Sequence, residues 1–280
     1  MDGVVEKVKA MNRESIIVAL RPSVADSLSR FESAAGLPVT FRPLPEGYTH
    51  RANAVYDPTN HAAIVSLAEG WRDVDVAHEV EHLRMQLVDG FGLLAWRKPA
   101  IIPDIDAAST RIMTYTQDEV VNRRLLDLGL TFDGEVIDSA LFRLYGQVTK
   151  KMRDGARPAE DGMAHLDAIG RGVLCRACYY VQATLIREQY ARLIQIDRRR
   201  RLEAFLDAFA ARRKRETKYA EAVLALFAES DVQTPAGQDR ILASWTKLEG
   251  IDAHTGVSHY ERTDEGRYIL PWPAAGGPGP

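Results

Sequence analysis

The first seventy residues mix helical and extended patterns of apolar positions. Pro22–Ala35 has helical spacing, whereas Ile16–Leu20 is a short β-branched run of the kind found in strands. Three more stretches, with polar interruptions between them, have the pattern of strands: Pro38–Leu44, Ala52–Tyr56 and His61–Leu67. We therefore expect a small sheet in this part of the chain.

From Trp71 onward the apolar pattern is helical. One apolar stripe runs along a helix that ends at Gly90 and Gly92, and its members are Val76, Val80, Leu83 and Leu87. Further helices are expected over Ile105–Leu128, Glu135–Arg153 and Gly162–Asp197. A highly charged segment then continues to Glu229.

The end of the chain combines a helix and a hairpin. Pro235 and Gly237 break the helical pattern before a short helix around Trp245. Val257–Trp272 alternates as a hairpin with its turn at Asp264-Glu265-Gly266. These elements predict an α+β fold with a small N-terminal sheet and a mainly helical C-terminal half. We expect a first domain at residues 1–132, a helical region packing on it at 133–270, and a flexible tail at 271–280.

Composition narrows the class of protein. The chain has 280 residues, 46% of them hydrophobic, which is enough to bury a sizeable core. Its net charge of −3 gives no reason to expect nucleic acid or an anionic membrane as the main partner. The sequence shows no signal-peptide pattern, no apolar run long enough to span a membrane, and two cysteines, too few for a disulfide framework. These features indicate a soluble, cytoplasmic protein.

The sequence His78-Glu79-Val80-Glu81-His82 falls on the helix after Trp71. Two histidines four residues apart project from one helix face and can bind one Zn²⁺ ion. Glu79, beside them, can accept a proton from a water molecule that the metal activates and deliver it to a leaving amine. At about 100° per residue, the two histidines lie opposite the apolar stripe, so one face packs the core while the other lines a cleft.

The run His61–Leu67, followed by Val74–Leu83, resembles the edge strand and active-site helix of zincin metallopeptidases. Within that clan the small cytoplasmic ImmA/IrrE-type peptidases are the nearest in pattern, over about residues 40 to 130. The resemblance implies a zincin-like catalytic domain at 1–132 and a Zn²⁺ cofactor. It also implies that His78 and His82 are zinc ligands and that Glu79 is the catalytic base in hydrolysis of a peptide bond.

The third ligand is less constrained by the sequence. Glu119, on the next predicted helix, is our choice, and Asn122 or Arg123 on the same helical face would orient its carboxylate. The alternatives are Asp118, Asp104, Asp106 or a distant histidine. The continuation typical of metzincins is absent, because Leu83–Gly92 contains no histidine.

Several other residues are interpreted as structural. Glu81 is expected to be solvated, and Cys175 and Cys178 are expected to be core residues rather than a redox or metal pair. The basic clusters Arg198–Arg201 and Arg212–Arg215 are interleaved with acids and apolar residues, which favours a solvated amphipathic helix.

The oxyanion donor is unknown. The candidates are His165, His254, His259, Tyr115 and Tyr260, with the adjacent pair His259-Tyr260 favoured.

The sequence therefore predicts a zinc metallopeptidase acting on a protein or peptide, with no membrane partner. The alternative is a catalytically silent zincin-fold protein that binds a regulatory partner protein, or nucleic acid, through its helical C-terminal half. The intact Glu79 argues against that alternative, because a purely structural zinc site needs no such carboxylate.

Overall fold

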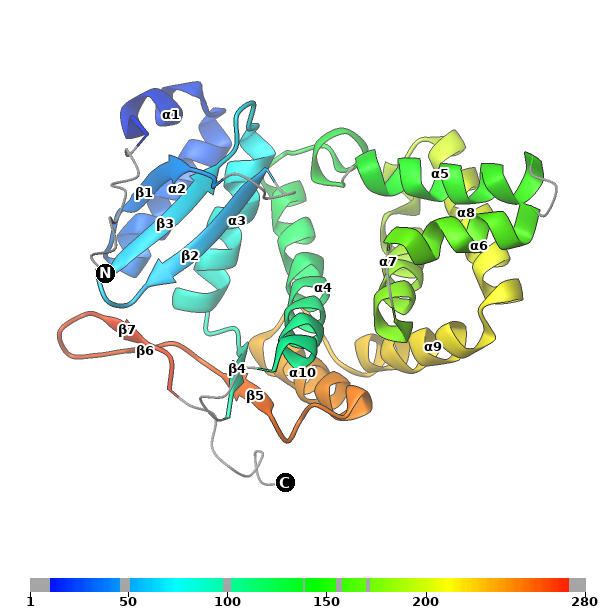
Figure 1. Cartoon of the computed structure of the whole chain (residues 1–280). Helices are drawn as coiled ribbons and strands as arrows, with labels where there is room; N and C mark the ends of the chain where they lie inside the picture. Colours follow the sequence, from blue (N-terminus) through cyan, green and yellow to red (C-terminus); the bar gives the residue numbers. More distant parts are fainter. Residues whose placement is uncertain are drawn as a thin grey trace, which may run out of the picture. The chain divides into compact units, whose positions relative to one another are not determined.

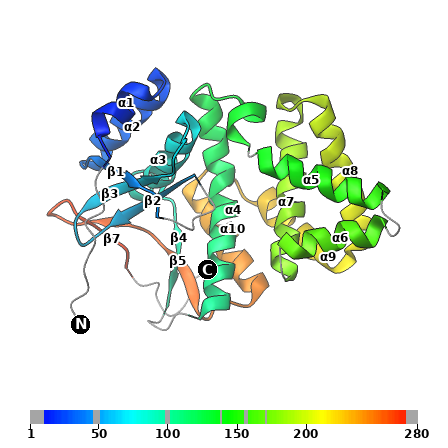
Figure 2. The same ribbon diagram turned by 45° about the horizontal axis from the view of Figure 1, so that its top comes forward.

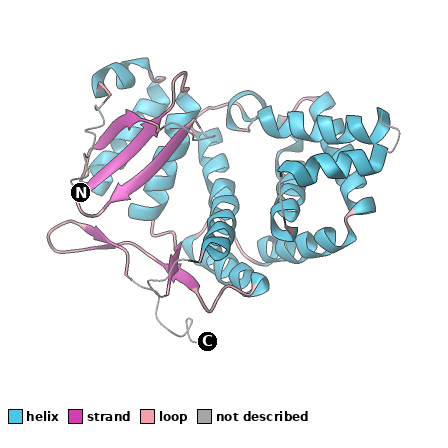
Figure 3. Ribbon diagram, in the orientation of Figure 1, coloured by secondary structure: helices cyan, strands magenta, loops and turns pink. Residues whose placement is uncertain are grey.

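The computed structural model describes residues 11–45, 51–97, 102–137, 139–154, 158–169 and 172–271. The described residues form a mixed, mainly helical structure with small sheets (Figure 1, Figure 3), so the α+β class is confirmed. By its internal contacts the chain divides into two compact units. The first comprises the described residues up to 93, 123–130 and 258–271, and the second comprises 94–122 and 131–257.

The first unit is built on a three-stranded sheet of order β1-β3-β2. β3 (Ala62–Leu67) pairs in parallel with β1 (Val39–Pro43) and antiparallel with β2 (Ala52–Asp57). The segment His61–Leu67 resembles a zincin edge strand in sequence, but β3 is the central strand of this sheet, with a neighbour on each side. Five of the six residues of β3 are buried, which agrees with that central position. The three predicted strands of this region are therefore confirmed.

Helices α2 (Pro22–Ala35) and α3 (Asp73–Leu87) lie on one face of this sheet (Figures 1 and 2). α3 packs against β2, β3 and α2. α2 ends at Gly36, whose φ of 72° is the left-handed conformation that glycine adopts without strain. The predicted helix at 22–35 is confirmed at both ends.

The β-branched run Ile16–Leu20 is not a strand. It lies in helix α1 (Arg13–Ala19), which begins where the Asn12 side chain accepts hydrogen bonds from the backbone N–H groups of Glu14 and Ser15, at 3.0 and 3.3 Å. The cap satisfies donors that would otherwise be unpaired in the first turn, and it overrides the weak strand propensity of the run.

The C-terminal hairpin and its expected turn are confirmed, but the hairpin begins later than the expected Val257, because Val257 and Ser258 belong to a separate strand. β6 (Glu261–Arg262) and β7 (Tyr268–Ile269) pair antiparallel, and Gly266 has a φ of 81° in the turn. Tyr268 fixes the hairpin in place: its backbone N–H donates to Tyr56 Oη at 3.0 Å, and its hydroxyl donates to the Ala35 carbonyl at 3.1 Å. Apart from Pro271, the predicted flexible tail lies outside the described residues.

The second unit is mainly helical. After α4 (Pro103–Asp127) and a short π-helical turn at Phe132–Val136, it contains helices that pack against one another through α5–α6, α5–α8 and α7–α9. Their bounds are α5 Ser139–Asp154, α6 Pro158–Ile169, α7 Val173–Tyr190, α8 Ile196–Arg212, α9 Lys214–Glu229 and α10 Pro235–Glu249. The first and last of its extended segments, β4 (Leu93–Trp96) and β5 (Thr255–Ser258), pair with each other.

The structure differs from the sequence predictions in two respects, the division of one helix and the domain boundary. The single helix expected over Gly162–Asp197 is divided into α6, α7 and the start of α8, because Gly172 has a φ of 85° and a short 3-10 turn follows Tyr190. Residues 94–122 and 258–270 also group differently from the expected boundary after 132. This grouping is decided by contacts between segments that are distant in sequence, and the local pattern of apolar residues gives no information about such contacts.

Among the described residues, none of the helices combines the length and the apolar character that crossing a bilayer requires.

Candidate metal centre

Helix α3 presents His78 and His82 on the side opposite its apolar stripe. All four stripe residues are buried, with exposed fractions from 0 to 6%, whereas both histidines are half-buried. The helix begins after Arg72, whose backbone N–H donates to the Asp75 carboxylate at 2.8 Å. The predicted amphipathic helix is therefore confirmed, and it leaves both imidazoles accessible from one side.

The two imidazoles approach each other through the same ring atom. His78 Nε2 and His82 Nε2 are 3.0 Å apart, and the ring planes are inclined at 71°. Two Zn–N bonds of usual length at a tetrahedral angle would place the two nitrogens about 3.3 Å apart. The pair is thus arranged, to within a few tenths of an ångström, as two ligands of one ion.

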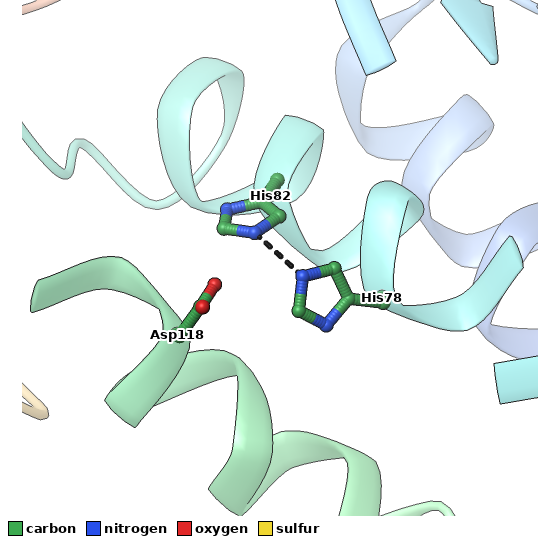
Figure 4. Close-up of side chains that lie close together, drawn as sticks. All are labelled: His78, His82 and Asp118. Atoms are coloured by element: carbon green, nitrogen blue, oxygen red, sulfur yellow. Dashed lines mark hydrogen bonds between the residues drawn. The ribbon is translucent and has the colours of Figure 1, made fainter. Parts of the chain in front are cut away.

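Asp118 of α4 completes a group of three potential ligands (Figure 4). One ligand atom each from His78, His82 and Asp118 lies within 4.8 Å of the others, and all three residues are half-buried. In the described part of the chain this is the group of three or more His, Cys, Asp or Glu side chains that could hold a metal ion. Two nitrogens and a carboxylate oxygen form a donor set that suits Zn²⁺.

Asp118 is positioned by the continuity of α4. The helix runs unbroken from Pro103 to Asp127, and its last turns, from Arg123 onward, belong to the first unit with α3. There Arg124 Nη1 donates to Asp89 Oδ2 at 2.6 Å and to Glu81 Oε2 at 3.3 Å. Asp118 lies fewer than two turns before Arg124 on the same helix.

Glu119, which we expected to be the third ligand, is not part of this group. It is 5% exposed, and its Oε1 accepts a hydrogen bond from the Tyr190 hydroxyl at 2.9 Å. Neighbouring helix positions differ by about 100°, so α4 cannot direct both carboxylates to the same point. The structure brings Asp118, one of the stated alternatives, to the histidines. Asp104 and Asp106 are exposed and lie outside the group. Asn122 and Arg123, which we expected to orient the Glu119 carboxylate, are half-buried and exposed, respectively.

Glu79 and Glu81 have contrasting environments. Glu79 is half-buried, and within the described ranges its carboxylate has neither a hydrogen bond nor an ion pair. Glu81 is 1% exposed and accepts a hydrogen bond from Ser27 Oγ at 2.7 Å. The prediction that Glu81 is solvated was wrong, because the helical-wheel argument considered α3 alone and not the neighbouring helices α2 and α4.

The cysteine pair lies in the core of the second unit. Cys175 and Cys178 are free thiols on α7, 3% and 0% exposed. Burial raises the pKa of the Cys178 thiol, which keeps it protonated at neutral pH and therefore a poor metal ligand and nucleophile. This environment agrees with the interpretation of the pair as core residues.

The arginine clusters are partly neutralised by acids of the same unit. Arg198 pairs with Asp133 at 3.1 Å, and Arg213 pairs with Asp167 and lies 3.9 Å from Glu216. The intervening Leu202, Phe205 and Phe209 are completely buried. This is the amphipathic pattern that the sequence indicated.

None of the described contacts assigns an oxyanion donor. His165 Nε2 is hydrogen-bonded to Gln147 Oε1 at 3.0 Å, and the Tyr260 ring packs edge-on against Tyr56. Burial raises the pKa of the Tyr115 and Tyr260 hydroxyls, which keeps both protonated and able to donate.

Comparison with known proteins gives no assignment: no family model, curated protein or solved structure matches the chain. The geometry of the site therefore carries the functional argument. Two residues that it includes, Asp118 and Arg124, were not selected from the sequence, although Asp118 was named as an alternative. Both residues lie on one predicted helix. Which of its side chains face α3 can be decided only once the rotation of α4 about its own axis is known.

Proposed function

We propose that the protein is a zinc-dependent metallopeptidase of the zincin type, with His78, His82 and Asp118 as zinc ligands and Glu79 as general base. The observation that carries the proposal is the 3.0 Å approach of the two Nε2 atoms beside the Asp118 carboxylate. Three protein ligands leave one position of a tetrahedral ion open, which is typical of catalytic rather than structural zinc sites.

The donor set favours zinc over the common alternatives. Mg²⁺ and Ca²⁺ prefer sites made entirely of oxygen ligands, whereas imidazole nitrogens suit Zn²⁺ and other transition metals. A zinc ion bound there would supply Lewis acidity, polarising a carbonyl and lowering the pKa of water to about 7. His78 and His82 must be neutral to bind it, and Asp118 must be ionised.

Glu79 supplies the proton transfer. It directly follows His78 on α3, is half-buried, and is not engaged by another side chain in the described segments. A carboxylate in that state can take a proton from the attacking water and pass it to the leaving amine. Glu81 cannot do so, because both of its oxygens already accept hydrogen bonds, Oε1 from Ser27 and Oε2 from Arg124.

Strand β2 suggests how a peptide would bind. It lies at an edge of the sheet, and α3, which carries the histidines, packs against it. An extended peptide can pair with such an edge through backbone hydrogen bonds, which hold the substrate with little dependence on its side chains. A peptide or protein substrate is therefore the class that we propose. The two free thiols agree with a reducing compartment, and we propose the cytoplasm.

Metal analysis of the purified protein tests the proposal. We expect about one zinc per chain in the wild type, because the described residues contain one three-ligand group. The double variant His78→Ala/His82→Ala should lose it. His165→Ala is the matched control: this histidine is held by Gln147 and Lys151, outside the group, so the variant should keep its zinc.

Hydrolysis is measured on the same preparations with a library of unstructured peptides. We expect cleavage by the zinc-loaded wild type and by His165→Ala, and none by the double variant. A wild-type protein that binds no zinc would refute the metal site. One that binds zinc at His78 and His82 but cleaves no peptide would refute the peptidase activity and favour the silent regulatory alternative.

A further inference from the structure

An ion-pair network with a buried carboxylate at its centre is built partly on the helix that carries the two histidines. At its centre is Glu81, between His78 and His82 on α3 and 1% exposed. Its Oε1 accepts hydrogen bonds from Ser27 Oγ at 2.7 Å and from Arg84 Nη1 at 3.3 Å, and its Oε2 accepts one from Arg124 Nη1 at 3.3 Å. One carboxylate thus joins α2, α3 and the end of α4.

Arg124 is held on a second side by the segment after α3. Its Nη1 donates to Asp89 Oδ2 at 2.6 Å, and its guanidinium carbon lies 5.4 Å from the centre of the Phe91 ring. Arg124 is therefore fixed against both α3 and the loop that follows it, although it belongs to α4. These contacts all lie within the first unit.

The network is poorly explained by stability alone. Burying a carboxylate carries a desolvation penalty that its attraction to arginines, here 22% and 24% exposed, often only offsets. What such a pair adds is a fixed relative position, because the charged atoms must meet at hydrogen-bond distance. Here the elements that it fixes are the helix with His78 and His82 and the helix with Asp118.

Metal ligation is sensitive to that relative position. A shift of α4 by one residue would move Asp118 by about 1.5 Å along the axis and rotate it by about 100°. Ligand distances in zinc sites are defined to about 0.2 Å. A device that locks α4 to α3 close to Asp118 would therefore contribute to metal affinity without touching the metal.

We propose that Glu81 and Arg124 are positioning residues of the metal centre, which set the register of α4 against α3 so that Asp118 reaches the ion held by His78 and His82. The inference rests on the proposed function, since it assumes that these three residues bind zinc. It adds two residues that act through Asp118 and that contact neither metal nor substrate.

Zinc affinity of matched arginine variants tests this role. The full-length variant Arg124→Met keeps the length of the side chain and removes its charge, and Arg21→Met is the control. Arg21 also forms an ion pair with a residue of α3, Asp73, at 2.8 Å. Because Arg21 lies at the start of α2, its loss should not change the position of α4. Zinc dissociation constants are measured by competition with a chromophoric chelator, and thermal unfolding of each apoprotein is recorded.

We expect Arg124→Met to bind zinc roughly 10–100-fold more weakly than the wild type, the range seen when a supporting contact of a ligand is lost. Arg21→Met should bind within about twofold of the wild type, even if it melts at a lower temperature. The visible spectrum of bound Co²⁺ should change in Arg124→Met alone, because its bands report coordination geometry, which a general loss of stability does not alter.

The outcomes separate this inference from the proposed function. A wild type that binds no zinc, or binds it equally well after His78→Ala, overturns both. If zinc requires the histidines but Arg124→Met binds it as the wild type does, or loses no more affinity than Arg21→Met, the positioning role alone is overturned. Should Arg124→Met fail to fold, the isosteric Glu81→Gln replaces it: a loss of at least about tenfold supports the role, and wild-type affinity refutes it.

Discussion

At the scale of single residues, the metal centre depends on the rotation of one helix. Asp118 and Glu119 are adjacent, and both are acids on α4, but their side chains leave the helix about 100° apart. Asp118 lies with the two histidines, whereas Glu119 is buried against the Tyr190 hydroxyl. Packing of α4 decides between them, and sequence spacing alone cannot.

This contrast predicts opposite effects of two substitutions. Asp118→Ala should weaken zinc binding severely, because it removes a ligand, while leaving stability in chelator nearly unchanged. Glu119→Ala should retain zinc but lower the free energy of unfolding by about 1–3 kcal/mol, since it removes the hydrogen bond that the Tyr190 hydroxyl donates to the buried Glu119 carboxylate. Zinc titration and denaturant unfolding of both variants check the pair. The reverse result would restore Glu119 as the ligand.

Glu79 gives a second prediction at this scale. Glu79→Gln should keep one zinc per chain, because Glu79 is not among the three ligands. It should lower hydrolysis by at least about 100-fold, since an amide cannot accept the proton of the attacking water. Zinc content and peptide cleavage are measured on one preparation. Cleavage at the wild-type rate would contradict the mechanism, and loss of zinc would mean that Glu79 helps to hold the metal.

Local spacing was sufficient for the first half of the site and not for the second. His78, Glu79 and His82 share one helix, so their relative positions follow from the α-helix itself. Asp118, Glu81 and Arg124 take their roles from contacts between helices. Glu81 was misread as solvated because the apolar stripe of α3 describes only the face toward the sheet, and not the sides covered by α2 and α4.

At the scale of elements, the predictions of helices succeeded or failed according to whether the residues that end each helix were recognised in the sequence. α2 matches its prediction because Pro22 and Gly36 mark both ends. The expected helix over Gly162–Asp197 failed at Gly172, whose positive φ ends one helix before the next begins. β4 and β5 were missed because each is four residues long and pairs with a partner far away in sequence.

Helix α7 carries a prediction about the cysteines. The double variant Cys175→Ser/Cys178→Ser should lose about 1–3 kcal/mol of unfolding free energy for each hydroxyl that it buries without a partner. Its zinc content should equal that of the wild type, because neither cysteine belongs to the metal group. Denaturant unfolding and metal analysis check both statements. Loss of a metal equivalent from folded protein would make the pair a metal site.

The first turn of α10 carries another. The break that we expected near Pro235 and Gly237 is present, because α9 ends at Glu229 and α10 begins at Pro235. Gly237 therefore lies inside α10, and a Cβ atom there would stand 1.8 Å from the Asp231 carbonyl oxygen. Gly237→Ala should therefore lower the free energy of unfolding by about 1–3 kcal/mol through overpacking. Ala236→Ser, at the exposed neighbouring position, should change it by less than about 0.5 kcal/mol. Equal stability of the two variants would contradict the close approach.

At the scale of the whole molecule, the two units do not follow the order of the chain. The first unit takes residues from the beginning, from the end of α4 and from the C-terminal hairpin. α4 is a single helix with residues assigned to both units, so the expected boundary after residue 132 could not capture the division. Sequence patterns identified the α+β class correctly because class depends on the kinds of element present, whereas this grouping depends on contacts between distant segments.

The metal links the site to the stability of the whole chain. Because zinc would bind the folded site and not the unfolded chain, zinc at about 100 times its dissociation constant should add about 2.7 kcal/mol to the free energy of unfolding. For a chain of this size that corresponds to a rise of roughly 5 °C in melting temperature. Calorimetry of the wild type with zinc and with chelator measures the shift, and His82→Ala should show none. A rise of the same size in His82→Ala would mean that zinc stabilises the protein from another site, and the assignment of His78, His82 and Asp118 would then fail.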